Sequence, residues 1–302
     1  MVLKLPDMLT GVDAAYTRPK GIVEASVART PRSMWATDYQ AENSVLLRTV
    51  LLLMGTLLGT EANANLRFEE GIARDPATKR VLYKEQHWIR FNEMLPVERL
   101  VMYRCPDGTA FARKRVNYQP SAQAPAFEFV DARKGFVEGL RYKQNKAALW
   151  FRPPGAAPEK NAVLTAQNLV ADAGFNEFIK ANWLKLRAGK ALPLQFAVPT
   201  RLQAYKFNLK QIGESQFAGV PAVTYQLKIA GLLSLIADPI EVTYDKASRR
   251  LLRFQGLSNL RDDAGEFDLK AQIDFPLPAR VASEEDWQKN ASAPLAACRL
   301  SL

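Results

Sequence analysis

The stretch FDLKAQIDF (residues 267–275) alternates strictly between apolar and polar side chains. Phe, Leu, Ala, Ile and Phe occupy the odd positions, and Asp, Lys, Gln and Asp occupy the even ones. Successive side chains of a β-strand point to opposite faces, so this pattern predicts a strand with one buried face and one solvated face. Strands of that kind belong to antiparallel sheets that cover a core on one side only.

The same alternation returns along most of the chain after residue 80. It predicts further strands at residues 81–91, 97–104, 109–118, 127–131, 136–142, 205–210, 223–229, 240–244 and 251–257. Between two of them, residues 105–108 (CPDG) supply the side chains that a tight hairpin turn prefers. The proline-rich residues 153–158 are interpreted as a long loop, because neither half of the chain closes a barrel alone. We therefore expect a mainly β (α+β) fold, in which a single curved antiparallel sheet or open half-barrel wraps one amphipathic helix.

One segment replaces the strand pattern with helical spacing. The apolar positions that recur at this spacing are Phe175, Phe178, Ile179, Trp183 and Leu186. Asn168 or Asp172 is a candidate cap for the start of the helix, and Gly189 is a candidate for its end. The apolar stripe has two interpretations. It packs against the sheet as core, or the helix partly fills, and is able to leave, a ligand-binding cavity.

On the second interpretation, the candidate ligand-binding residues are Phe175, Phe178, Ile179 and Trp183. Aromatic residues on the facing strands would complete such a cavity.

The segment LLRTVLLLMGTLLGTEANA (residues 46–64) has the build of a secretory signal peptide. Its apolar core is too short for a membrane-spanning helix, which needs roughly 20 residues, and a small-x-small sequence follows it. We expect residues 45–64 to be a signal peptide cleaved after Ala64, with an uncleaved anchor as the alternative, and we expect the mature protein in the periplasm. Residues 1–44 are interpreted as an unstructured leader or an over-long translation start, and residues 65–302 as a single β-rich half-barrel domain.

Charge and cysteine content are consistent with an envelope location. The formal net charge is +10, and removal of residues 1–64 takes away equal numbers of basic and acidic side chains. A protein with this charge would meet anionic lipid head groups or envelope polymers. The alternative is that the charge only keeps the protein soluble. Cys105 and Cys298 are the only cysteines. In an oxidising compartment they are a candidate disulfide, and two unpaired thiols are the alternative.

The chemistry of catalysis is mostly absent from the sequence. His87 is the only histidine, and it stands inside an alternating strand away from any nucleophile motif, so we interpret it as structural. The acidic pairs at 262–263 and 284–285 are interpreted as solvated surface. The sequence has no metal-ligand spacing, calcium loop, phosphate loop or dinucleotide fingerprint. We therefore expect no enzyme activity, no catalytic residues, no metal and no cofactor.

Two basic clusters stand beside aromatic residues. They are Arg113, Lys114 and Arg115, and Arg249, Arg250 and Arg253. They would contact lipid phosphates or remain as solvated strand edges, and we expect no nucleic-acid partner.

Three segments carry a resemblance to known proteins. They are AGFNEFIKANWLKL (173–186), FAVPTRLQAYKF (196–207) and IEVTYDKASRRLLRFQGLSNL (240–260). Over roughly residues 78–277 the chain resembles a family of exported bacterial proteins without established function. Its plan is also similar to periplasmic lipoprotein carriers, in which a half-barrel wraps an internal helix around an apolar cavity.

Together these features predict a periplasmic, non-enzymatic binding or carrier protein for an apolar or amphipathic, lipid-like ligand. The alternative is an envelope interaction protein that binds an anionic membrane surface or an assembly partner through a basic face.

Overall fold

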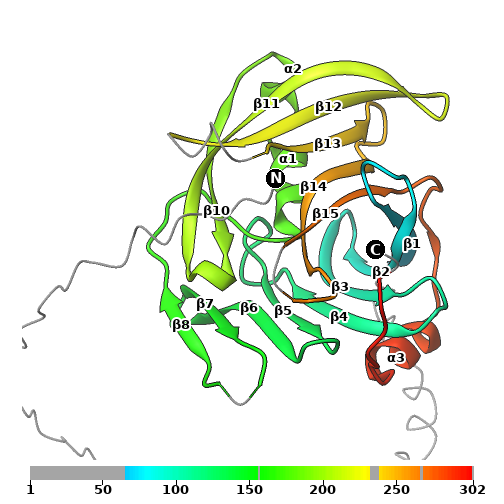
Figure 1. Ribbon diagram of the computed structural model, residues 1–302. Coiled ribbons are helices and arrows are strands. Elements are labelled where there is room, and N and C mark those ends of the chain that lie inside the picture. The colour runs from blue at the N-terminus through cyan, green and yellow to red at the C-terminus, as the bar shows by residue number, and fades with distance from the viewer. Residues whose placement is uncertain (1–64, 156, 232–237, 266–267, 301–302) are drawn as a thin grey trace, which may run out of the picture. The chain divides into compact units, whose positions relative to one another are not determined.

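The computed structural model describes residues 65–155, 157–231, 238–265 and 268–300. The predicted leader (1–44) and signal peptide (45–64) lie outside these residues, as does Phe267. The described residues form one large, open, curved sheet of sixteen strands with three short α-helices and one 3-10 turn (Figure 1). The predicted mainly β fold class is confirmed. None of the helices in these residues is long and apolar enough to cross a membrane.

The strands fall into two consecutive series. The first comprises β1 (Asn65–Arg74), β2 (Val81–Asn92), β3 (Leu95–Arg104), β4 (Ala110–Asn117), β5 (Ala126–Asp131), β6 (Phe136–Lys143), β7 (Lys146–Arg152) and β8 (Lys160–Val163). The second comprises β9 (Leu169–Val170), β10 (Leu192–Val198), β11 (Gln203–Phe217), β12 (Val220–Ile229), β13 (Ile240–Asp245), β14 (Leu251–Arg261), β15 (Asp268–Asp274) and β16 (Arg280–Val281). The helices are α1 (Gly174–Ala181), α2 (Trp183–Arg187), the 3-10 turn η1 (Pro199–Arg201) and α3 (Glu284–Ser292).

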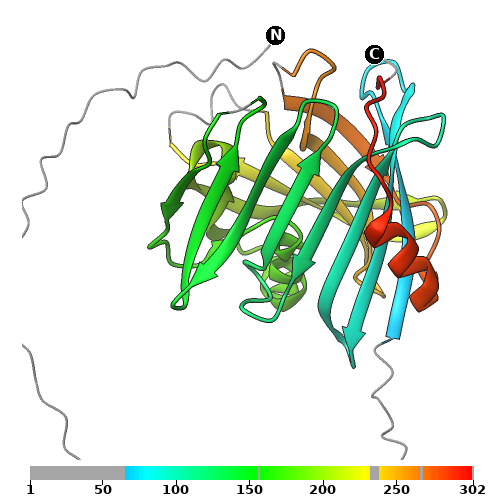
Figure 2. The same cartoon turned by 90° about the horizontal axis from the view of Figure 1, so that it is seen from below.

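The order of strands across the sheet explains why it stays open. The order is β8-β7-β6-β5-β4-β3-β2-β1-β15-β14-β13-β12-β11-β10-β9, with β16 added to β1. The two series meet where β1 pairs with β15, with Ile72 opposite Asp274. The free edges β8 and β9 are neighbours in the chain, joined by residues 164–168, and η1 lies against β6 and β7. The sheet therefore curves until its two edges approach each other without pairing (Figure 2).

The predicted hairpin turn at residues 105–108 is confirmed. The N–H of Gly108 donates to the Cys105 carbonyl over 2.8 Å, and Gly108 has the positive φ of +92° that only glycine adopts without strain. Several strands, however, were not predicted. Strand β7 buries Ala147, Ala148 and Leu149 in succession, so it shows no alternation. Strands β8, β9 and β16 are too short to show a pattern.

The predicted single helix is two helices. The two helices meet at Asn182, which leaves the helical conformation with a φ of −106° and a ψ of 15°. Its backbone N–H and its side-chain amide both donate to the Phe178 carbonyl, over 3.1 and 3.0 Å. Neither predicted side-chain cap is used, since the N-cap residue is Ala173 and it makes no capping hydrogen bond. Gly189 follows α2 with a φ of +79°, which agrees with the predicted end. The third helix, α3, was not predicted.

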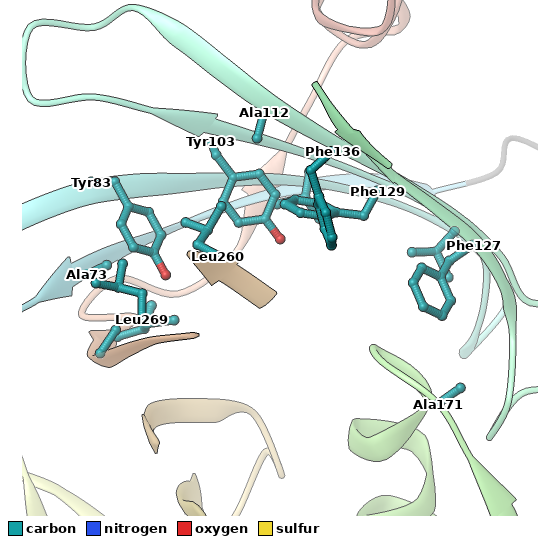
Figure 3. Packing of buried hydrophobic residues seen from close by; sticks show 14 of the residues in the cluster. Ala73, Tyr83, Tyr103, Ala112, Phe127, Phe129, Phe136, Ala171, Leu260 and Leu269 are labelled. Atoms are coloured by element: carbon teal, nitrogen blue, oxygen red, sulfur yellow. The ribbon is translucent and has the colours of Figure 1, made fainter. Parts of the chain in front are cut away.

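An aromatic cluster lines the inner face of the first strand series (Figure 3). Its largest members are Tyr83, Tyr103, Phe111, Tyr118, Phe127, Phe129, Phe136, Leu140 and Leu149, with Leu260, Leu269 and Phe275 from the second half of the sheet. The rings meet edge to face, as between Tyr103 and Phe129 at 5.5 Å between centroids. We call this set the aromatic cluster.

Helices α1 and α2 lie within the curve of the sheet and pack against the second series (Figure 1). The members of this helix cluster are Val170, Phe175, Phe178, Ile179, Trp183, Leu186, Leu194, Leu209, Val223, Tyr225, Leu227, Val242 and Tyr244. The inner face therefore carries two apolar clusters, and the partly buried Leu251 and Phe254 pack against both of them.

Helix α3 lies on the opposite, outer face of the sheet (Figure 2). There it covers Leu66, Trp88, Leu100 and Met102, and Trp287 packs into the same group. Ser283 caps the helix by accepting a hydrogen bond from the Asp286 N–H over 3.1 Å.

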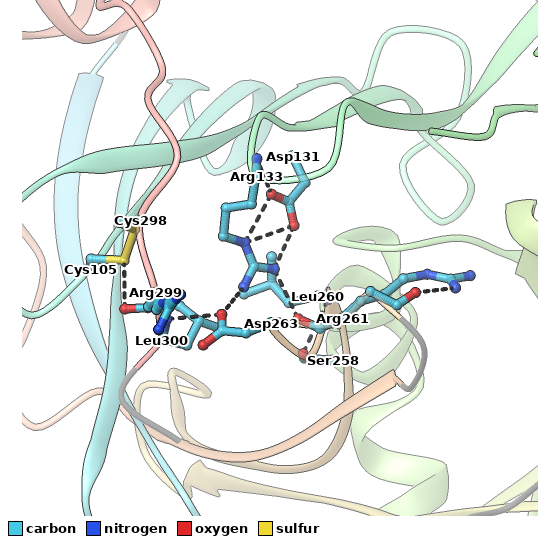
Figure 4. A network of polar contacts seen from close by, with 11 residues as sticks. Cys105, Asp131, Arg133, Ser258, Leu260, Arg261, Asp263, Cys298, Arg299 and Leu300 are labelled. Carbon is cyan, nitrogen blue, oxygen red and sulfur yellow. Dashed lines mark hydrogen bonds and ion pairs between the residues drawn. A yellow bond between two sulfur atoms is a disulfide. The ribbon is translucent and has the colours of Figure 1, made fainter. Parts of the chain in front are cut away.

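A disulfide holds the C-terminal tail to the end of β3. Cys105 and Cys298 are bonded, and the next residues of the tail reach the β14–β15 turn, where the Leu300 N–H donates to Asp263. Asp263 also pairs with Nη1 of Arg133, while Nε and Nη2 of the same guanidinium donate to the Asp131 carboxylate (Figure 4). The acidic pair at 262–263 was interpreted as solvated surface. Asp263 is instead part of the network that fixes the tail.

Candidate functional site

The four predicted ligand-binding side chains are buried in the helix cluster. Phe175, Phe178, Ile179 and Trp183 are at most 9% exposed. Trp183 meets Tyr225 and Tyr244 edge to face, at 5.7 and 6.2 Å between ring centroids. The structure therefore brings these residues together on the wall of the sheet, where they pack as core.

A second set of inner-face residues is polar, and the sequence analysis did not identify it as a site. We call it the interior polar layer, and its members are Glu85, His87, Arg99, Lys114, Tyr118, Glu138, Asp172 and Asn259. Strand alternation places them inside, because Glu85 and His87 share a face with the buried Tyr83. Lys114 likewise shares a face with buried Ala112 and Val116.

The layer touches both apolar clusters. The Lys114 ammonium lies over the rings of Tyr103 and Phe129 in the aromatic cluster, at 5.9 and 5.7 Å from their centroids. On the other side, Asp172 lies in the chain between Val170 and Phe175, two members of the helix cluster. The interior thus has apolar, polar and apolar regions in succession.

The centre of the layer is a buried ion pair. Lys114 Nζ donates to Asp172 Oδ2 over 2.6 Å, and both side chains are under 10% exposed. Asn259 bridges the pair, since it accepts from Lys114 at 3.4 Å and donates to Asp172 at 3.1 Å. Asn259 itself is exposed, so the layer reaches solvent at this point.

Glu138 lies beside this pair without a salt bridge of its own. Burial raises its pKa to about 7, although Lys114 and the Asn259 amide both act to lower it. The only hydrogen bond found for it among the described residues is a long one of 3.5 Å from Asn259. Near neutral pH this carboxyl group is therefore divided between its protonated and ionised forms.

A chain of three side chains runs along β2 and β3. His87 Nε2 lies 2.9 Å from Glu85 Oε2, and an Arg99 terminal nitrogen lies 3.3 Å from His87 Nδ1. Arginine only donates, so Nδ1 is the acceptor and the ring proton sits on Nε2, which donates to Glu85. His87 is buried and bonded to side chains of its own strand and the next one. Its role is to connect a carboxylate to a guanidinium.

Arg99 and Tyr118 carry donors without partners. The Nε of Arg99 and the hydroxyl of Tyr118 are buried, and neither has a hydrogen-bond partner among the described residues. Burial opposes the charge of Arg99, yet nearby Tyr118, Glu69 and Glu177 raise its pKa above its ordinary value. No carboxylate of the described residues lies within ion-pair distance of Arg99.

The two predicted basic clusters are largely occupied by contacts within the chain. Arg113 and Arg115 donate to the carbonyls of Ala293 and Ala291 at the C-terminal end of α3, at 3.0 and 2.7 Å. Lys114 points to the interior.

The second cluster behaves in the same way. Arg250 donates to the carbonyls of Phe275 and Leu277, Arg253 pairs with Asp274, and Arg249 lies over the Trp183 ring. Five of the six side chains therefore contribute to folding at the sheet surface, and neither cluster is a free basic patch.

The described residues form at least two hollows. One, of about 440 Å³, lies near the free edges of the sheet, with Tyr142, Leu164 and Leu169 among its lining residues. The other, of about 210 Å³, is lined mainly by polar residues of β11 to β14, among them Thr224, Thr243 and Arg253. Neither is lined by the four predicted helix residues. The described residues contain no cluster of side chains suited to a metal ion.

Comparison with known proteins shows little similarity. No family model matches the chain, and no curated protein matches it. Among solved structures, the crystal structure of a beta-barrel-like protein of domain of unknown function DUF1849 from Brucella abortus is similar, with a TM-score of 0.36 and 7% sequence identity. The alignment covers 72% of this chain and 98% of that chain.

Proposed function

We propose that this protein is a non-enzymatic binding protein, or carrier, that holds an amphipathic small molecule inside its open sheet. One observation carries the proposal. The interior has a polar layer between two apolar clusters, and this layer reaches solvent at Asn259. A ligand with an apolar body and a polar group would match that order of surfaces.

The proposed location is the periplasm. The signal-like sequence at residues 46–64 supports it, as does the Cys105–Cys298 disulfide, because structural disulfides persist in oxidising compartments. Strand β1 begins at Asn65, so cleavage after Ala64 would leave every described strand intact. The intact mass of protein recovered from the periplasm should correspond to a chain that starts at Asn65. A mass that retains residues 1–64 would contradict this location.

The resemblance to periplasmic lipoprotein carriers, drawn from the sequence, is our reason for proposing a lipid-like ligand. A membrane-surface role is the alternative, and it requires free basic side chains. Arg113, Arg115, Arg250 and Arg253 are already engaged within the chain, so we prefer the interior site. Co-sedimentation with anionic liposomes separates the two, because surface binding should fall steeply as salt rises and interior binding should persist.

The test of the interior site uses the neutral fluorescent probe N-phenylnaphthylamine and a variant at the solvent opening. Asn259→Trp places a bulky ring where the polar layer meets solvent, and we expect it to weaken probe binding by roughly tenfold. Leu257→Trp is the matched control, since Leu257 is an exposed residue of the same strand. Equal binding by both variants would contradict an interior site. Absence of probe binding, together with no ligand in lipid extracts of the purified protein, would contradict the proposed function itself.

A further inference from the structure

The donors around Arg99 outnumber the acceptors that the fold supplies to them. A guanidinium group has five N–H donors in a planar fork. Among the described residues only one acceptor is found for Arg99, the Nδ1 atom of His87, and Nε is buried without a partner. A buried donor without an acceptor destabilises the protein, so a binding partner that supplies an acceptor recovers that free energy.

Tyr118 presents a second donor at the same place. Its side chain is 4% exposed, its hydroxyl has no partner among the described residues, and Arg99 is its strongest electrostatic neighbour after the effect of burial. Burial raises the pKa of Tyr118 to about 12, so the hydroxyl keeps its proton at neutral pH. The strand register also places the two residues near each other, because Arg99 pairs with Val116 and the Tyr118 N–H donates to the Val97 carbonyl over 3.0 Å. Two unpaired donors, one of them cationic, therefore lie on neighbouring strand segments of the inner face.

The position of Arg99 is fixed by a chain of hydrogen bonds along β2 and β3. Glu85 accepts from His87, and His87 in turn accepts from Arg99, so the guanidinium is held from one side. Phe275 packs edge to face on the His87 ring, at 5.4 Å between centroids. This arrangement orients a guanidinium in advance of a ligand, as second-layer hydrogen bonds do in binding sites generally.

The carboxylates near Arg99 are engaged elsewhere or solvated. Asp172 is paired with Lys114, and Glu177 is paired with Lys180 at 3.0 Å. Glu69 keeps part of its surface in solvent. None of them neutralises Arg99 directly, so its charge remains available to an incoming anion.

We propose that the interior site takes an amphiphile with an anionic head group, a carboxylate or a phosphate, which the Arg99 fork and the Tyr118 hydroxyl bind together. The inference rests on the proposed function and adds the chemical class of the ligand. Both head groups present oxygens in a geometry that guanidinium matches with two parallel hydrogen bonds. The apolar part of the ligand lies along the neighbouring aromatic cluster, beside Phe275.

The experiment compares two probes that differ only in head-group charge, dansylaminoundecanoic acid and its methyl ester. The wild-type protein should bind the acid more tightly than the ester. Arg99→Gln should weaken binding of the acid by roughly tenfold to a hundredfold, the value of a charged hydrogen-bonded contact, and leave binding of the ester within about twofold. Arg152→Gln removes the same charge from an exposed position of β7, and it should change neither. A long-chain alkyl phosphate and a fatty acid are then used to displace the bound acid probe. The concentration of each that displaces half of the probe shows whether the site binds a phosphate or a carboxylate head group more tightly.

Tyr118→Phe separates a binding role from a structural one. The hydroxyl has no partner in the protein, so its removal should leave the thermal midpoint unchanged or higher, while binding of the acid falls by roughly fivefold or more. If Arg99→Gln does not fold, Arg99→Lys keeps the charge and loses the fork, and it should bind the acid at an intermediate affinity.

The outcomes distinguish this inference from the proposed function. Equal binding of acid and ester by the wild-type protein, or no loss of acid binding in Arg99→Gln and Tyr118→Phe, overturns the anionic head group while an interior binding site stands. Binding of neither probe, together with no binding of the competitors, overturns both.

Discussion

Glu138 is a carboxyl group whose proton affinity the fold has changed. Burial raises its pKa from 4.5 to about 7, so between these values the folded protein holds a proton that the unfolded chain has released. The contribution to stability is therefore present at low pH and lost as pH rises through about 7. Glu138→Gln should match the wild type near pH 5 and exceed its unfolding free energy above neutral pH by on the order of 3 kcal/mol.

Denaturant unfolding at several pH values measures this effect. Glu128→Gln on the neighbouring strand is the control, because Glu128 is exposed, and its difference from the wild type should not grow with pH in this range. If the difference in unfolding free energy between Glu138→Gln and the wild type stays constant from acid to alkaline pH, the pKa of Glu138 is not raised by folding.

Gly139 is a position at which no side chain fits. A Cβ there would lie 2.1 Å from the Phe127 carbonyl oxygen and 2.8 Å from the Trp150 ring nitrogen. Gly139→Ala should destabilise the protein by roughly 1–3 kcal/mol or more, because the backbone of β5 must move. Gly213→Ala is the matched control, since a Cβ there meets nothing within 4 Å. A thermal melt of both variants checks the prediction. Equal melting midpoints would contradict it and show that the backbone of β5 shifts at little cost in stability.

The polar interior was the part of the site that sequence alone did not reveal. Alternation placed His87 on the buried face of its strand, and in that sense its position was predictable. Lys114 was grouped with Arg113 and Arg115 because the three are adjacent, although strand period puts the middle one inside and the outer two outside. Asp172 and Asn259 come from distant segments, so only the folded sheet brings them to Lys114.

The helical segments show where periodicity succeeds and where it stops. The apolar stripe that begins at Phe175 correctly predicted a helix packed on the sheet, because one buried face dictates its spacing. The break at Asn182 is a change of backbone conformation at one polar residue, which hydrophobic spacing does not record. Helix α3 was not predicted because most of its residues are polar. Trp287 is its only large apolar side chain, and one residue is not enough to show a helical pattern.

Helix α3 is held to the sheet by Trp287 and by charged contacts around it. The Arg90 guanidinium lies 4.9 Å from the centre of the Trp287 ring and also pairs with Glu284. Trp287→Ala should lower the unfolding free energy by about 2 kcal/mol through lost apolar burial and the lost cation–π contact. Lys289→Ala, on an exposed position of the same helix, should stay within about 0.5 kcal/mol of the wild type. Chemical denaturation resolves the two, and similar values for both would mean that α3 is detached in solution.

The disulfide closes a loop of 193 residues, so it constrains the unfolded chain strongly. In the chain-entropy model such a bridge contributes about 5 kcal/mol. Reduction should therefore lower the thermal midpoint by roughly 10 °C for a protein of this size. The double variant Cys105→Ser, Cys298→Ser should melt at the reduced value with or without reductant. A midpoint that does not respond to reductant in the wild type would contradict a stabilising role.

The sequence predicted those parts of the sheet in which consecutive strands pair with each other. Alternating strands and the turn at residues 105–108 specify antiparallel neighbours, and a chain of such neighbours makes a meander. The pairing of Ile72 with Asp274 has no local signal, because neither strand encodes its partner in the sequence around it. The number of strands was underestimated for a related reason, since edge strands such as β8 and β9 are too short to show a pattern.

Strand β1 pairs with β2 and with β15. During synthesis or translocation, β1 and β2 emerge long before β15 does. The hairpins of each meander form as the chain emerges, whereas the seam between β1 and β15 must wait until residue 274 is free. During that interval β1 presents an open edge that other chains can extend. Assembly is therefore vectorial with a late closing step. A mutation that slows this step would reduce the yield of the protein while leaving the finished molecule as stable as before.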